Sequence, residues 1–284
     1  IVTGRGAEFL ERMKMEKRIG RQVGDITEGA ALHINNMKLE GLLTSVAAEL
    51  PSLQEKGVWL VAPTANDPRD KIRLAWRINT STPYINTKLV KTEELPQSWK
   101  DLLGLRWKGK MSLGEPNIGG SVYQTIVVLM DNRVWDEEYM RSLYRQNLRF
   151  FSGDAEELSA LARGEIHLSV RVVDGTAARF VQEGATIQAI DMKEGVVVTT
   201  GSVGAIAGAP NPNAARVFLN WIFSPEGQTV TGRAQGNKMV RKDVPDFRPK
   251  GVQTPLSNPL VTDLDQLERA TQLFREKWFD KVVG

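Results

Sequence analysis

Four stretches of the sequence place polar side chains where a predicted strand gives way to a helix. Residues 117–121 read NIGGS, in which Gly119 and Gly120 let the backbone approach an anion and Ser121 can donate a hydrogen bond. Arg171 follows an apolar strand, and its planar guanidinium matches a carboxylate or phosphate group. Ligands of open α/β sheets bind beyond the carboxyl ends of strands, so these residues predict binding of a small anion. The alternatives are an ordinary glycine turn and an arginine that lies on the surface or bridges two lobes.

The other two stretches carry an acid near the start of a predicted helix. Residues 152–154 read SGD, and Asp154 either caps the helix that follows or contacts the ligand. Residues 27–29 read TEG after a short predicted strand at 24–26. Glu28 there either is an acid at a helix start, binds an ammonium group, or pairs with Arg171 across a closed cleft. The candidate ligand contacts of these two stretches are Ser152, Asp154, Thr27, Glu28 and Gly29.

Two more side chains are candidate ligand contacts. Residues 4–6 read GRG, like the start of a dinucleotide-binding loop, but no third glycine and no ribose-binding acid follow. Nucleotide binding is therefore not expected, although Arg5 could still contact the ligand. Tyr84 lies with Trp76 in an extended stretch, where aromatic rings either pack within the strand or stack on a ligand.

The composition excludes several classes of function. The chain of 284 residues has no cysteine, which removes thiol catalysis, disulfides and cysteine-based zinc sites. Its two histidines, His33 and His167, are far apart, so we expect no metal site, no cofactor and no catalytic residues. Lysine and arginine number 37 against 34 acids, a dispersed net charge of +3 that does not indicate nucleic acid. No membrane-spanning run or signal peptide is evident, so an exported protein would be represented here by a processed chain.

The length favours two lobes, and strands alternate with helices in a way that predicts parallel βαβ units. Two extended passages, near residues 75–87 and 190–200, bracket a compact α/β unit inserted in a larger one. The pattern predicts helices over residues 7–20, 30–43, 121–132, 135–146, 154–163, 175–183 and 262–282, a helix around Trp99, and strands over 24–26, 109–113, 148–151, 166–172 and 186–190.

Residues 211–228 predict two helices separated by a sharp stop. Asn213 is placed to cap the first helix, with Pro212 before it. Ser224 is placed to cap the second, with Pro225 at its first helical position.

This run, with GAP at 208–210 before it and SPEGQ at 224–228 within it, resembles the carboxy-terminal signature of extracellular solute-binding proteins of ABC importers. Residues 95–113 resemble a second segment of that family, a tryptophan-bearing helix followed by a Trp-Lys-Gly-Lys turn and a strand. The two matches occur in the expected order. The resemblance is to the branch that binds ferric iron, phosphonates or thiamine-like solutes.

The resemblance implies an α/β, two-lobed type II periplasmic-binding-protein fold with two crossover hinge strands. Lobe 1 would combine residues 1–82 and 195–250, lobe 2 would be residues 83–194, and residues 251–284 would form a helical tail. The family's first strand and helix, roughly thirty residues, have no counterpart before Ile1.

The implied function is capture of a small anionic solute, such as a phosphonate, phosphate ester or carboxylate, in the interlobe cleft and its delivery to a membrane permease. We expect a periplasmic or extracellular monomer, and a lipid anchor on the full-length precursor stays open. Iron-binding relatives carry a tyrosine pair where this chain has Arg171, Val172 and Val173, which argues against ferric ion. Ferric ion with a synergistic anion, an enzyme that uses Glu28, Asp154 or Asp174 as a base, and a sensor domain are the alternatives.

Overall fold

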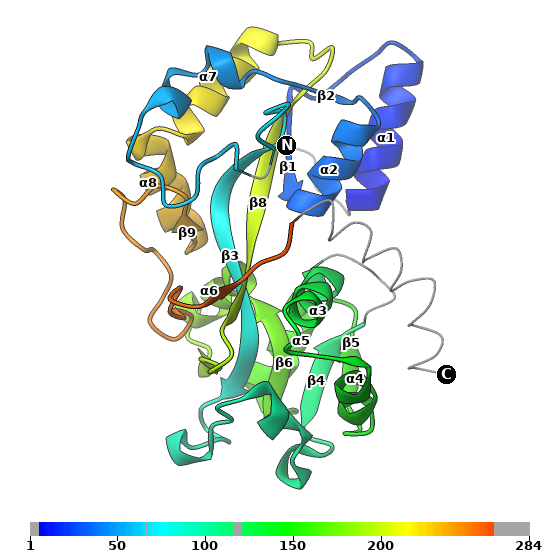
Figure 1. The fold of residues 1–284 in the computed structure, drawn as a ribbon, viewed down its shortest axis with the longest axis vertical. Helices are drawn as coiled ribbons and strands as arrows, with labels where there is room; N and C mark the ends of the chain where they lie inside the picture. The colour runs from blue at the N-terminus through cyan, green and yellow to red at the C-terminus, as the bar shows by residue number, and fades with distance from the viewer. Residues whose placement is uncertain (1–5, 66, 116–120, 264–284) are drawn as a thin grey trace. The chain divides into compact units, whose positions relative to one another are not determined.

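The computed structural model divides the chain into two compact units (Figure 1). It describes residues 6–65, 67–115 and 121–263. The first unit combines the chain up to Ile78 with Thr200–Phe247, and the second combines Asn79–Thr199 with the chain from Arg248 onward. Strands β3 (Leu74–Asn86) and β8 (Val196–Ile206) each contribute residues to both units.

The first unit packs helices around a short set of antiparallel strand pairings. Its other elements are α1 (Gly6–Arg18), β1 (Ile26–Ala30), α2 (Ala31–Leu39), β2 (Leu43–Thr44), α7 (Pro212–Ile222), α8 (Pro225–Gln235), β9 (Lys238–Met239) and 3₁₀ helices at Ala47–Glu49 and Pro51–Gln54. Strands β1 and β2 pair with β8, and β9 pairs with β3, all antiparallel.

The predicted parallel arrangement is therefore wrong for the pairings described in this unit. A strand followed by a helix indicates a parallel crossover only when the next strand in the sequence becomes its neighbour. Here the neighbour of β1 is β8, which comes far later in the chain, with Ile26 opposite Ala205 and Ala30 opposite Gly201. Residues 27–29 consequently lie inside a strand, and not in a loop after it as predicted.

Helices α7 and α8 confirm the predicted helix, stop and second helix. The Ser224 hydroxyl accepts a hydrogen bond from the Gly227 N–H at 3.1 Å, as a cap does. The first cap was misplaced by the prediction: α7 begins at Pro212, so Asn211 precedes the helix and Asn213 lies within its first turn. Proline has a fixed φ and no N–H, which suits it to the first helical position.

The second unit contains the parallel strands that the alternating pattern predicted. Its elements are η3 (Thr92–Glu94), η4 (Trp99–Leu103), η5 (Leu105–Trp107), β4 (Met111–Gly114), α3 (Ser121–Asp131), α4 (Glu137–Tyr144), β5 (Arg149–Phe151), α5 (Asp154–Arg163), β6 (Leu168–Val173), α6 (Asp174–Gln182), β7 (Ile187–Ala189) and β10 (Pro259–Leu260). Strand β4 pairs in parallel with both β5 and β6, and Ser112 lies opposite Arg149 and Ser169. The helix predicted around Trp99 is the short 3₁₀ helix η4.

The parallel strands β4, β5 and β6 each lead toward a helix start at the carboxyl end (Figure 1). Strand β4 precedes α3, β5 precedes α5 and β6 precedes α6, so the three helix amino termini follow the same edge of the parallel strands. Helix α5 packs on all three strands through a buried face that includes Leu158 and Leu161. The predicted helix at 262–282 lies outside the described residues from position 264 on.

Within the described ranges, none of the helices combines the length and the apolar character needed to cross a membrane.

Gly227 explains why the SPEGQ run requires a glycine. A Cβ at this position would overlap the backbone carbonyl of Trp221, where α7 turns into α8. We expect Gly227→Ala to lower the unfolding free energy by about 3 kcal/mol, measured by urea denaturation. Thr229→Ala, on the exposed side of the same helix, is the control and should change it by less than about 0.5 kcal/mol. Equal stability of the two variants would show that the turn relaxes without cost.

Candidate solute-binding site

Side chains from three other elements of the second unit converge on Arg171 in strand β6. The guanidinium is fully buried, and two of its nitrogens donate to Asp154, from Nη1 to Oδ1 at 2.8 Å and from Nη2 to Oδ2 at 3.3 Å. Nη2 also donates to the Ser121 Oγ at 2.8 Å, and Nε donates to the Ser81 Oγ at 3.3 Å. Strand β6 is thereby tied to the first turns of α5 and α3 and to strand β3.

The Asp154 side chain pairs with Arg171 and does not cap helix α5. The residue before the helix is Gly153, and the Asp154 carboxylate accepts from Arg171 and from the Val173 N–H at 3.1 Å. The predicted capping role is therefore wrong. A buried guanidinium needs a counter-charge and acceptors for its N–H groups, and Asp154 provides both through a bidentate contact. Glu28, which was predicted to pair with Arg171 as one alternative, instead pairs with Arg77 at 2.9 Å.

The Ser121 hydroxyl is the half-buried part of this cluster. Its oxygen accepts from the cationic Nη2 of Arg171, so the hydroxyl hydrogen must point away from the guanidinium. Ser121 is also the first residue of α3, an 11-residue helix whose first N–H groups have no acceptor within the helix. The arrangement presents hydrogen-bond donors at the carboxyl end of β4.

Glu157 lies one turn after Asp154 on the buried face of α5. Its Oε1 accepts from the hydroxyls of Ser112 and Ser169, both at 2.6 Å. Oε2 has no hydrogen-bond partner within the described part of the chain. Burial raises the pKa of Glu157 from its ordinary 4.5 to about 7, with the two serine bonds and Arg171 acting in the opposite direction.

Gly114 allows the charged groups to approach strand β4. A Cβ at this position would lie 2.7 Å from Cγ2 of Val122, 3.8 Å from Nη1 of Arg171 and 4.0 Å from Oε2 of Glu157. Any larger residue would push on α3, and the space beside the two ionisable side chains exists because this residue is glycine.

A second buried ion pair lies at the start of α6. Arg248 Nη1 is 3.4 Å from Oδ2 of Asp174, and both side chains are buried. The Thr80 hydroxyl donates to the same oxygen at 2.8 Å, and the Gly175 N–H donates to Oδ1 at 2.9 Å. Burial raises the pKa of Asp174, against the opposing effect of Arg248. This pair fixes the segment that begins at residue 248 to the second unit.

The remaining predicted contacts have different surroundings. Tyr84 is fully buried in an apolar cluster with Val172, Ala177 and Ile187, the packing environment that was its alternative interpretation. Ser152 donates through its hydroxyl to Glu156 at 2.7 Å. Thr27 and Gly29 lie in β1 of the first unit with Glu28. Arg5, Gly119 and Gly120 lie outside the described residues.

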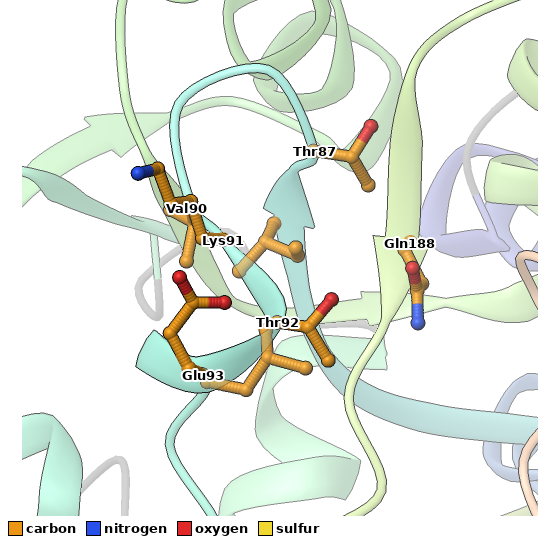
Figure 2. A pocket seen from close by; sticks show the side chains of 8 residues that line it. Thr87, Val90, Lys91, Thr92, Glu93 and Gln188 are labelled. Carbon is orange, nitrogen blue, oxygen red and sulfur yellow. The ribbon is translucent and has the colours of Figure 1, made fainter.

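An open pocket of about 280 Å³ lies elsewhere in the second unit (Figure 2). Figure 2 shows Lys91 and Glu93 on one side of it and Gln188 on the other. Its lining residues are Ile85, Thr87, Val90, Lys91, Thr92, Glu93, Leu95 and Gln188, none of which was a predicted ligand contact. Among the residues described, no three histidine, cysteine, aspartate or glutamate side chains gather as metal ligands would.

Ser81 and Glu157 were missed by the sequence reasoning. Ser81 was hidden because its partner Arg171 lies far along the chain. Glu157 carried a usable signal, since it shares a helix face with the buried Leu158 and Leu161, where a carboxylate is out of place.

The family model for bacterial extracellular solute-binding proteins matches residues 33–250, more than half of the chain. The chain belongs to this family. Its members are the substrate-binding components of ABC importers, which act outside the cytoplasmic membrane and bind solutes without transforming them.

Two curated relatives of this solute-binding protein are distant. A probable ABC transporter periplasmic-binding protein, y4fP of Sinorhizobium fredii, is 22% identical over 98% of this chain and 82% of its own length. An uncharacterized protein of Haemophilus influenzae is 26% identical over 52% of this chain. That match spans only 42% of the Haemophilus protein.

Solved structures confirm the two-lobed type II fold. AfuA of Actinobacillus pleuropneumoniae, with fructose-6-phosphate bound, has a TM-score of 0.76 at 19% identity and covers 99% of this chain and 89% of its own. Iron-bound HitA of Pseudomonas aeruginosa has a TM-score of 0.75 at 15% identity, and the match covers 97% of this chain and 89% of the HitA chain. At these identities the likeness concerns the fold of the solute-binding protein.

The raised pKa of Glu157 predicts a pH-dependent stability. Between about pH 4.5 and pH 7 the folded protein keeps a proton that the unfolded chain releases, so this stabilisation is lost as pH rises through 7. We expect the unfolding free energy of the wild type to fall by about 3 kcal/mol more than that of Glu157→Gln across this range. Urea denaturation at a series of pH values measures the difference. Parallel curves would show that Glu157 is ionised in the folded protein at low pH.

The pair of Asp174 and Arg248 predicts a large effect from removing one partner. Arg248→Met should lower the unfolding free energy by about 3 kcal/mol, because Asp174 is left buried without its cation. Adding Asp174→Asn removes that stranded charge and should restore part of the loss. The exposed Arg163→Ala is the control and should leave the urea midpoint unchanged. A double variant no better than Arg248→Met would show that lost packing of the arginine causes the defect.

Proposed function

We propose that this solute-binding protein captures a small anionic solute at the carboxyl ends of β4 and β6 and delivers it to its ABC permease. A phosphonate, a phosphate ester or a carboxylate fits the donors there. The observation that supports this most directly is the 2.8 Å bond from Nη2 of Arg171 to the Ser121 Oγ. Because the serine oxygen is occupied as an acceptor by a cation, its hydroxyl donates outward to a solute oxygen.

The charge of the site favours an anion that is held by hydrogen bonds over one that is held by an uncompensated positive side chain. Asp154 compensates Arg171 through a bidentate contact, so the pair carries no net charge. An anion held by Ser121 and the first N–H groups of α3 gains from the helix dipole and from donors already in place. Arg171 acts as the fixed support of Ser121 in this scheme.

The neighbouring structures support an anionic solute only as an analogy. The AfuA structure has fructose-6-phosphate bound, and the HitA structure is iron-bound. In this chain Val172 is fully buried beside Arg171, and neither residue offers the phenolate oxygen that ferric ion prefers. We propose further that the protein works as a monomer.

A thermal-shift screen tests the class of solute. The panel contains sulfate, methylphosphonate, fructose 6-phosphate, citrate and ferric nitrilotriacetate. An anion at about 100 times its Kd should add about 2.7 kcal/mol to the unfolding free energy and raise Tm accordingly. A shift with ferric nitrilotriacetate alone would overturn the proposal and favour ferric ion.

An anion identified by the screen then serves to test whether the Ser121 hydroxyl contributes to binding. Ser121→Ala removes the outward hydroxyl and should weaken binding of that anion at least about ten-fold, since a hydrogen bond to a charged group contributes about 1.5–3 kcal/mol. Ser142→Ala, an exposed serine on α4, is the matched control and should bind as the wild type does. Isothermal titration calorimetry measures both. Equal affinity of the two variants would place the solute elsewhere.

A further inference from the structure

We infer, building on the proposed anion site, that Glu157 is a specificity-determining residue: it holds the proton that keeps the buried cluster around Arg171 neutral, so that an anion binds together with a proton.

The hydrogen bonds of Glu157 leave one oxygen for a proton. Ser112 and Ser169 are both fully buried, and each donates its hydroxyl hydrogen to Oε1 at 2.6 Å. Oε2 faces no hydrogen-bond partner among the residues that the structure describes, although the side chain is entirely buried. A bare carboxylate oxygen in such a place costs more free energy than a protonated one, because the protonated group carries no charge.

Glu157 lies close enough to the Arg171 cluster to control its charge. Oε2 of Glu157 and Nη1 of Arg171 both come within 4.0 Å of the point where a Cβ on Gly114 would stand. Asp154 lies three residues earlier on the same helix, and residues at this spacing are neighbours on a helix face. One guanidinium and two carboxyl groups thus share a small volume at the end of strand β4.

Among the residues that the structure describes, the elements packed on α5 bring no other compensating charge to Glu157. Strand β4 offers only uncharged residues, and Arg149 of β5 is exposed and pairs with Glu165. On α6, Asp174 is paired with Arg248, and Arg179 lies over the Phe180 ring. The remaining charged groups that face Glu157 are Asp154 on its own helix and Arg171 on β6.

The protonation of Glu157 therefore decides the net charge that a bound anion meets. With Glu157 protonated, Arg171 and Asp154 cancel and the cluster is neutral. With Glu157 ionised, the cluster carries one negative charge and repels an anion at Ser121. Burial raises the pKa of Glu157 to about 7, so the change falls in the neutral range of pH.

Linkage makes the effect reciprocal, since an anion that prefers the protonated site must also raise the proton affinity of that site. Affinity should fall as pH rises above about 7, by roughly five-fold or more, the range typical of coupled sites. Solutes whose own negative charge increases over the same pH range should lose the most affinity.

Sulfate is the suitable probe, because its charge is constant over the neutral range and any change in affinity belongs to the protein. Calorimetric titration at about pH 5.5, 7 and 8.5 should show tight binding at the lowest value and binding at least about five-fold weaker at the highest. Glu157→Gln, which keeps the shape and both serine bonds without a charge, should bind sulfate with one affinity at all three values. Ser142→Ala should retain the wild-type pH dependence.

The wild-type protein provides a second measurement that needs no variant. Titration at about pH 7 in buffers of different ionisation enthalpy should reveal uptake of roughly 0.4 proton per bound sulfate. Sulfate binding without proton uptake and with a flat pH profile overturns the role of Glu157 while leaving the anion site intact. A pH dependence that persists in Glu157→Gln also overturns that role. Absence of sulfate binding at every pH overturns the anion site itself.

Discussion

The buried contact between Arg171 and Asp154 is the constraint on which the second unit's binding end depends. Arg171 is not stable alone in this environment, because an unpaired, fully buried charge costs several kcal/mol. The pair therefore fixes the distance between strand β6 and the first turn of α5. The two guanidinium nitrogens that also contact Ser121 and Ser81 extend the same constraint to α3 and β3. Strand β6, helices α5 and α3 and strand β3 meet because the Arg171 guanidinium must find hydrogen-bond acceptors for its N–H groups.

Small residues make this coordination fit. Gly114 leaves room on strand β4, and hydroxyl groups surround both the arginine and Glu157 where longer side chains would force the carboxyl and guanidinium groups apart. Hydroxyls can act as acceptors toward Arg171 and as donors toward Glu157, so one residue type satisfies opposite needs. The site is consequently dense in oriented donors, and the charges of Arg171 and Asp154 cancel within it.

Local chemistry was readable from the sequence, and pairing over long distances was not. The Ser224 cap, the helix that begins at Asp154 and the parallel strands of the second unit follow from signals within a few residues. Arg171 was identified as a residue that follows a predicted strand, although the structure places it inside β6. Its partner was not identified, since a carboxylate at a helix start looks the same whether it caps the helix or pairs with a distant cation. The antiparallel pairing of β1 was not predicted for the same reason, because its neighbour β8 is separated from it by most of the chain.

The contact between Asp174 and Arg248 has a consequence for synthesis on the ribosome. Asp174 emerges with the strands and helices around it, but its cation belongs to a segment translated only after α7, α8 and β9 of the other unit. Until residue 248 leaves the exit tunnel, the nascent second unit must keep that acid hydrated or protonated. Its completion therefore waits for the segment that begins at Arg248, although most of its residues are made earlier.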